Sequence, residues 1–329
     1  MRYKPVTNTT ERETAVARPT RSLKAYAGLT LRGMAMGASD IVPGVSGGTM
    51  AFILGIYEEL IDSIRTIGRP EFLSAALRLR IRQALQILNW PFLLAVGLGI
   101  FISVLTLSGL LEWLLVNQPV YIWSFFFGLV LASAFTVSKR IPHWTVPLIL
   151  TTLAGAAAAY LLVGMVPAQT PNTWWFLILS GALASCAMIL PGISGAFILV
   201  ILGKYAFILN AVNTRDLVSI GLLGIGAAIG LISFAQVLSW MFKQHHNLTV
   251  AVLIGLMLGS LRKIWPWQIA IGDGHGAETT SQHINILPSL ATSADVLQVV
   301  AAVALMITGI VAIVVLDRVA NLKEQVAEG

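Results

Sequence analysis

The chain has 329 residues, of which 57% are hydrophobic and 11% are charged, and its formal net charge is +6. A soluble domain carries roughly 25% charged residues, so this chain has too few charges to cover a water-facing surface. Composition therefore excludes an ordinary cytoplasmic enzyme, a nucleic-acid-binding protein and a disordered chain, and favours a polytopic membrane protein. The single Cys186 excludes a disulfide within the chain and a metal site built from several cysteines.

Residues 1–22 are basic and polar, and they lack the apolar core of a secretory signal peptide. We expect them to form a flexible cytoplasmic tail. Five later segments are long enough to span a bilayer and contain no Asp, Glu, Lys or Arg. They are residues 92–111, 119–138, 144–166, 217–242 and 296–316, and residues 244–261 form a shorter candidate.

Two further apolar regions are broken by proline and glycine, and their sequences match. Residues 41–57 read IVPGVSGGTMAFILGIY and residues 189–205 read ILPGISGAFILVILGKY, with nine of 17 aligned positions identical. A second pair, FGLVLAS at 127–133 and IGLMLGS at 254–260, follows in the same order. These repeats predict two homologous membrane halves, residues 23–166 and 167–329. Within them, Gly226 and Gly230, and likewise Gly255 and Gly259, have the spacing of close helix packing.

Each half consists of a broken hairpin followed by three apolar spans. If the hairpin returns the chain to its starting side, three more crossings leave the second half inverted. With the N-terminus inside, 17 of the 21 Lys and Arg residues fall on predicted cytoplasmic segments, as the positive-inside rule requires. We expect an all-α polytopic membrane protein with two inverted-topology repeats. Each repeat is a broken, re-entrant helical hairpin plus three transmembrane helices, and both termini are cytoplasmic. The basic surplus then serves topology and contact with membrane lipids, and no nucleic acid is involved.

The repeated Pro-Gly-x-Ser-Gly motif interrupts a helix and frees backbone N–H and C=O groups. Lipid cannot satisfy these groups, so the motif must be buried in protein or line a wet cavity. Freed N–H groups at the start of the next helix favour an anion such as phosphate. The hydroxyls of Ser46, Thr49 and Ser194 add donors, and the Gly47–Gly48 pair lets a ligand approach the backbone. Inverted repeats would place both tips near the membrane midplane; the alternative role of the glycines is tight helix packing.

Charged residues also lie within the broken regions. Arg32 and Asp40 would share a helix face about 12 Å apart. Charge inside a membrane segment is costly and indicates function, so we expect Arg32 to hold a phosphate and Asp40 to bind a proton or orient Arg32. The alternatives are a structural ion pair, or Arg32 reaching the cytoplasmic interface. Lys204 either extends to the outer interface or attracts an anionic headgroup.

The sequence offers little support for bound metal or for catalysis. Asp273, His275, Glu278 and His283 match no zinc-site spacing. The chain has no nucleotide P-loop and none of the commonest hydrolase motifs. We therefore expect no catalytic residue, no metal and no cofactor.

The segment GMAMGASDIVPGVSGGTMAFILGIYEELIDSI at 33–64, together with the second motif, resembles the bacterial polyprenyl-phosphate transporters of the PopT type. The resemblance implies a flippase that moves undecaprenyl phosphate from the outer to the inner leaflet of the bacterial cytoplasmic membrane. Such a flippase recycles the lipid carrier of cell-wall peptidoglycan synthesis. Carried over by position, the first motif supplies Ser39, Asp40, Pro43, Gly44, Ser46, Gly47 and Gly48, and the second supplies Pro191, Gly192, Ser194 and Gly195. The second motif departs by having Ala196 where the first has Gly48 and Met188 where it has Asp40.

Two other classes of function remain open at this point. A small-anion transporter or channel would share the inverted-repeat design. A membrane-embedded lipid phosphatase would use Ser46 or Ser194 as a nucleophile, but neither motif contains a histidine to act as its base. The sequence leaves open a homo-oligomer, coupling to a proton or another ion, and full crossing of the membrane by the hairpins.

Overall fold

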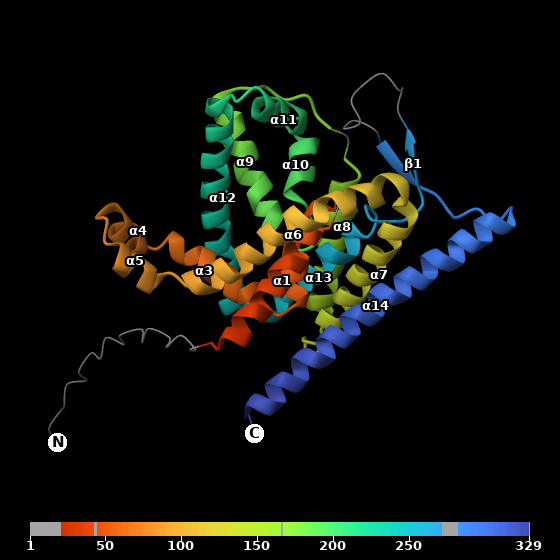
Figure 1. Cartoon of the computed structure of the whole chain (residues 1–329), viewed down its shortest axis with the longest axis horizontal. Helices are drawn as coiled ribbons and strands as arrows, with labels where there is room; N and C mark the ends of the chain where they lie inside the picture. Colours follow the sequence, from red (N-terminus) through yellow and green to blue (C-terminus); the bar gives the residue numbers. More distant parts are fainter. Residues whose placement is uncertain (1–20, 43–44, 166, 272–281, 329) are drawn as a thin grey trace.

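The computed structural model describes residues 21–42, 45–165, 167–271 and 282–328, and helices make up most of them (Figure 1). Most of the predicted cytoplasmic tail therefore lies outside the described residues. Ser22 caps the first helix, because its Oγ accepts a hydrogen bond from the Ala25 N–H at 3.3 Å. The elements are α1 (Leu23–Ile41), α2 (Gly47–Ile53), α3 (Tyr57–Ile67), α4 (Pro70–Leu77), α5 (Ile81–Ile87), α6 (Trp90–Asn117), α7 (Pro119–Ser138), α8 (Val146–Val163), α9 (Trp174–Ile189), α10 (Gly195–Ile201), α11 (Tyr205–Asn213), α12 (Leu217–Gln244), α13 (His246–Ser260), β1 (Gln268–Ile271), β2 (Gln282–Asn285) and α14 (Ser293–Glu328).

Five of the described helices are long and apolar enough to cross a membrane. They are α6, α7, α8, α12 and the Ser293–Arg318 part of α14. These helices correspond to the five predicted uncharged segments, which confirms a polytopic membrane protein. The shorter candidate at 244–261 is α13, a 15-residue apolar helix.

Glycines hold four pairs of helices in close contact: α1 with α6, α9 with α12, α8 with α13, and α7 with α14. A Cβ atom at Gly33 or Gly99 would collide with the partner backbone between α1 and α6, and Gly181 and Gly226 do the same between α9 and α12. Small residues let backbones approach where lipid supplies no hydrophobic drive for association. The packing role predicted from spacing is thus confirmed for Gly226, Gly230, Gly255 and Gly259.

Two regions outside the predicted spans and motifs contain regular structure. Helices α4 and α5 fall within residues 65–91 and project away from the bundle beside α3 (Figure 1). Strands β1 and β2 fall within residues 262–295 and pair antiparallel, with Gln268 opposite Asn285. Both were missed because the elements are too short to show a periodic pattern: α4 and α5 have eight and seven residues, and each strand has four.

Both broken regions are interrupted at the motifs. Helix α1 ends at Ile41 and α2 begins at Gly47, while α9 ends at Ile189 and α10 begins at Gly195. Helices α10 and α11 are bent by 106° at their break. Residues 47–52 of α2 are all buried, and α2 contacts both α7 and α9. The described part of the first motif, from Val45 onward, therefore sits in the core of the bundle, whereas α10 is buried only at Ile201.

Candidate functional site

The first motif caps the start of α2 with its own side chains. The Gly47 N–H donates to Asp40 Oδ1 at 2.6 Å, and the Gly48 N–H donates to Ser46 Oγ at 3.1 Å. Asp40 reaches this position because it stands in the last turn of α1, just before the break. A carboxylate at the start of a helix is stabilised by the N–H groups that have no partner within the helix. Asp40 thus occupies the place where the sequence analysis expected an anion.

The Ser46 hydroxyl also joins the first motif to the second. Ser46 is fully buried, and its Oγ lies 3.2 Å from the Met188 carbonyl oxygen and 3.3 Å from that of Leu190. A hydroxyl has one proton, so it donates to one of these carbonyls at a time. Met188 lies in the last turn of α9 and Leu190 is its C-cap, where carbonyls lack partners within the helix. The Leu190 carbonyl also accepts from the Ile193 N–H at 3.4 Å.

Two more hydrogen bonds cross between the motifs. The Gly192 N–H donates to Thr49 Oγ1 at 2.8 Å, and the Tyr57 hydroxyl donates to the Ile189 carbonyl at 3.1 Å. Thr49 and Tyr57 are buried. We call this contact the tip junction; it consists of Ser46, Thr49 and Tyr57 on one side and residues 188–192 on the other. The structure therefore brings the two predicted motifs together.

Glycine is required where the two backbones meet. A Cβ at Gly48 would collide with the Ile189 carbonyl, and one at Gly47 would collide with the Asp40 carboxylate. Gly192 has a backbone φ of +86°, a conformation that residues with a side chain rarely adopt, and it lies against Ser260. These glycines allow backbone contact between the motifs in the described conformation.

The second motif is not equivalent to the first. Ser194 stands at the N-cap of α10 but makes no capping hydrogen bond, and it is only half-buried. Pro191 is buried, and Gly195 packs against the Ala184 carbonyl. Met188, at the position that matches Asp40, is 51% exposed. Only the first motif carries a carboxylate that occupies its own helix start.

Arg32 lies outside the tip junction, at the middle of α1. The charges that act on it are Arg21, which repels it, and Glu59, which attracts it. Glu59 accepts two hydrogen bonds from Arg21, both at 2.7 Å, and one from Asn89 at 2.9 Å. The hydrogen bonds that Arg21 donates to Glu59 raise the pKa of Arg21. The alternative of a structural ion pair between Arg32 and Asp40 is not seen in this conformation: Asp40 accepts from the Gly47 N–H, and no ion pair joins the two side chains among the described residues.

Lys204 does not extend to the surface. Its side chain is 1% exposed, and its Nζ donates to the Thr170 carbonyl at 2.7 Å and to Asn172 Oδ1 at 2.6 Å. The rings of Phe176 and Phe207 lie within cation–π range. Of the two alternatives for Lys204, extension to the outer interface is therefore wrong for this conformation, since the ammonium connects the start of α11 to the residues before α9.

The remaining predicted residues are placed only in part. Ser39 is buried in α1, and its carbonyl accepts from the Val42 N–H at 3.2 Å. Pro43 and Gly44 lie outside the described residues, and so do Asp273, His275 and Glu278. No group of three or more potential metal ligands occurs in the parts of the chain that the structure describes.

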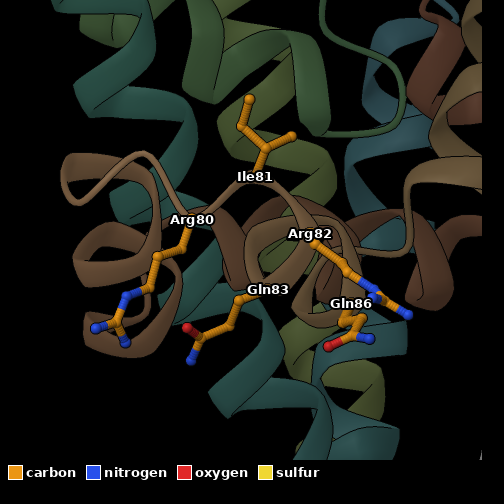
Figure 2. A pocket seen from close by; sticks show the side chains of 5 residues that line it. All are labelled: Arg80, Ile81, Arg82, Gln83 and Gln86. Atoms are coloured by element: carbon orange, nitrogen blue, oxygen red, sulfur yellow. The ribbon is translucent and has the colours of Figure 1, made fainter.

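Two described cavities lie away from the tip junction. The larger, about 570 Å³, opens along α5, and Figure 2 shows Ile81 pointing away from Arg80 and Arg82 there. The smaller, about 70 Å³, lies between α3 and α12. No residue of the tip junction lines either one. Their linings are Arg80, Ile81, Arg82, Gln83 and Gln86 for the larger, and Glu58, Ile61, Asp62, Ser239, Phe242 and Lys243 for the smaller.

The tip junction is built from hydroxyl side chains that form hydrogen bonds with backbone groups. The Ser46 hydroxyl donates to a backbone carbonyl and accepts from a backbone N–H, so none of its partners among the described residues could take its proton as a general base. This arrangement does not support a serine nucleophile at Ser46. Sequence reasoning missed Tyr57, although its identity with Tyr205 in the repeat alignment marked the position.

Comparisons with known proteins agree with this picture. The sequence profile of the undecaprenyl phosphate translocase-like family matches residues 36–282. A polyprenyl-phosphate transporter of Vibrio cholerae is 45% identical over 243 residues, which cover 74% of this chain and 79% of the relative. A polyprenyl-phosphate transporter of Staphylococcus aureus is 31% identical over 257 residues, or 72% of this chain and 85% of the relative. No solved structure matches.

The relatives are named as transporters, which confirms the expectation that the chain is not an enzyme. The family match spans the first motif, the second motif and the helices between them. The resemblance inferred from the motifs is confirmed on the same residues, and the chain belongs to the undecaprenyl phosphate translocase-like family.

Proposed function

We propose that the chain is a flippase that moves undecaprenyl phosphate from the outer to the inner leaflet of the bacterial cytoplasmic membrane. The observation that carries the proposal is the tip junction. Two Pro-Gly-x-Ser-Gly motifs, far apart in sequence, meet through side chain–backbone hydrogen bonds in the core of an apolar bundle. The names of the two relatives supply the substrate class.

The proposed architecture is a pair of inverted repeats with re-entrant hairpins. Matching helices support it: α2 and α10 both have seven residues, α6 and α12 both have 28, and each motif is followed by a left-handed glycine, Gly55 or Gly203. The packing pairs also correspond. The first helix of each half packs on the first long span of the same half, and the last helix packs on the middle span of the other half. The distribution of positive charge supports a cytoplasmic location for both termini.

The phosphate is proposed to bind where the hairpin tips separate. Opening the tip junction frees the hydroxyls of Ser46 and Thr49, and the Gly47 and Gly48 N–H groups become available if Asp40 withdraws. A phosphate and the Asp40 carboxylate would compete for the same donors, since both are anions. Protonation of Asp40 would weaken its hold on Gly47, which offers a route for coupling to protons. The lipid tail stays in the bilayer, so only the headgroup needs a polar path.

Arg32 and Lys204 belong to this proposal at the two ends of the path rather than at its centre. Arg32 lies at the middle of α1, before Asp40 in the chain and on the predicted cytoplasmic side of the tip junction, and would meet the headgroup as it leaves. Lys204 lies at the start of α11, in the hairpin predicted to enter from outside. Because its Nζ is occupied by Thr170 and Asn172, it can contact a headgroup only after that hairpin moves.

The experiment counts undecaprenyl phosphate on the outer surface of host cells with a lipid-specific probe that cannot cross the membrane. We expect depletion of the protein, with any redundant transporter removed, to raise the surface signal. Wild type should reverse the rise, whereas Ser46→Ala with Thr49→Ala should not. An unchanged signal on depletion would reject the flippase, and full rescue by the double variant would reject phosphate binding at the tips.

A parallel measurement separates the flippase from a channel or small-anion transporter. Proteoliposomes that contain the purified chain should move a labelled polyprenyl phosphate between leaflets and pass no phosphate-dependent current. A current without lipid movement would favour the alternative.

A further inference from the structure

The two hairpins are packed unequally in this structure. Helix α3, which follows the first tip, packs along α12, but α11 shows no comparable packing on α6 within the described ranges. The side chains report the same difference. Tyr57 and Ile61 on α3 are each 1% exposed, whereas Tyr205 and Leu209, which hold the matching positions on α11, are 36% and 51% exposed. We call the side where α3 packs on α12 the closed side. The matching side, where α11 stands apart from α6, is the open side.

Polar side chains hold α3 against α12 on the closed side. Asp62 Oδ1 on α3 accepts a hydrogen bond from Ser239 Oγ on α12 at 2.6 Å. Arg65 Nη1 donates to the same Ser239 Oγ at 3.2 Å, and Lys243 Nζ lies 4.0 Å from Asp62. We call the Asp62–Ser239 contact the first latch. It connects the hairpin of one half to a long span of the other.

The matching positions on the open side are Asn210 and Glu112. Asn210 corresponds to Asp62 in the repeat alignment. Glu112 corresponds to Ser239, because each stands just before a tryptophan, Trp113 or Trp240, at the same place in a 28-residue helix. Both side chains are exposed. No hydrogen bond or ion pair of either one occurs among the residues that the structure describes.

The chemistry of this second pair is complementary with its polarity reversed. In the first latch the hairpin supplies the acceptor, Asp62, and the span supplies the donor, Ser239. In the second pair the hairpin supplies an amide donor, Asn210, and the span supplies a carboxylate acceptor, Glu112. A carboxylate within an apolar spanning helix is costly unless it is solvated or paired. Glu112 is such a carboxylate, and Asn210 is a donor on the element that would reach it.

We propose that Glu112 and Asn210 form a second latch that closes the open side in the other access state, when the first latch is broken. The proposal rests on the proposed transport function. It assigns one pair of residues to each of the two access states. A hairpin that leaves α12 on one side lets its counterpart dock on α6 on the other. A packed interface of this kind favours two discrete arrangements over a continuum.

The test is chemical cross-linking in membranes. Cys186→Ala removes the chain's single cysteine, and Glu112→Cys with Asn210→Cys then reports the second latch with a short bifunctional thiol reagent. We expect a low yield of linked peptides by mass spectrometry, which rises several-fold when Asp62→Ala and Arg65→Ala weaken the first latch. Glu112→Cys with Val212→Cys is the matched control, because Val212 lies two residues along α11 on another face. It should stay low throughout.

A second measurement tests the polarity of the pair. Asn210→Asp would set two carboxylates against each other and should slow lipid movement by about tenfold, which corresponds to ~1.4 kcal/mol. Adding Glu112→Gln restores one donor and one acceptor, so activity should return. A merely structural role for Asn210 would not predict this rescue.

The two proposals fail in different ways. Cross-linking uses no substrate, so latch exchange without polyprenyl phosphate movement would reject the proposed function alone. A Glu112–Asn210 yield that never exceeds the Val212 control, or that does not respond to loss of the first latch, would overturn the latch exchange alone. Failure of Glu112→Gln to rescue Asn210→Asp would overturn the pairing.

Discussion

Ser46 supplies a hydrogen-bond donor at the end of a helix inside the membrane, where the last carbonyls lack partners. The last carbonyls of α9 have no helical partner, and lipid offers no donor. Ser46 reaches across from the other half and donates to them, while the same oxygen accepts from the Gly48 N–H. One buried hydroxyl therefore stabilises two interrupted helices at once.

Replacement of this hydroxyl should cost stability. Ser46→Ala leaves the α9 carbonyls and the Gly48 N–H without this partner, and a buried unsatisfied group costs about 1–3 kcal/mol. We expect a lower thermal unfolding midpoint for the purified protein in detergent. Ser194→Ala is the matched control, because Ser194 makes no capping hydrogen bond, and it should change the midpoint less. Equal losses would show that the tip junction does not depend on Ser46.

Backbone contact at Gly48 can be tested in the same way. Gly48→Ala places a methyl group against the Ile189 carbonyl, and overpacking of this kind typically costs about 1–3 kcal/mol. Gly28→Ala, in α1, meets nothing within 4 Å and should be neutral or stabilising by up to about 1 kcal/mol. Unfolding midpoints that rank the two variants the other way would contradict the close approach of the motifs.

At the scale of elements, each half carries one insertion that the other lacks. Helices α4 and α5 separate α3 from α6, whereas three residues separate α11 from α12. The β1–β2 pair lies between α13 and α14, and the corresponding connection from α7 to α8 is short. The alternating sequence LRLRIR at 77–82 exposes Leu77, Leu79 and Ile81 beside three arginines. Apolar and basic side chains in alternation suit the surface of an anionic leaflet.

The position of α5 gives a direct test of orientation. In the Cys186→Ala background, Arg80→Cys should react with a membrane-impermeant thiol reagent only after spheroplasts are opened, since α5 is predicted to be cytoplasmic. Arg215→Cys, in the connection between α11 and α12, should react in intact spheroplasts. If both cysteines labelled from the same side, the inverted arrangement of the halves would be wrong.

At the scale of the whole molecule, the features that could be predicted from the sequence are those that depend on composition and on repetition. The five spans follow from uncharged length, and the pairing of two motifs follows from their shared Pro-Gly-x-Ser-Gly core. The contacts of Asp40, Arg32 and Lys204 could not be predicted, because each depends on how the hairpins dock against the rest of the bundle in three dimensions. Lys204 is a clear case: its acceptors, Thr170 and Asn172, lie in a segment with no motif.

The same dependence on docking yields a prediction for the complete cycle. Asp62→Cys with Ser239→Cys in the Cys186→Ala background should be linked by a short bifunctional thiosulfonate reagent, which joins each cysteine through a disulfide, because the native side chains are 2.6 Å apart. If the first hairpin must leave α12 for transport, the link should stop lipid movement in proteoliposomes, and reductive cleavage should restore it. The singly substituted Asp62→Cys protein, treated with the same reagent, controls for modification alone. Transport that continues through the intact link would show that α3 and α12 move as one body and that the access change occurs elsewhere in the bundle.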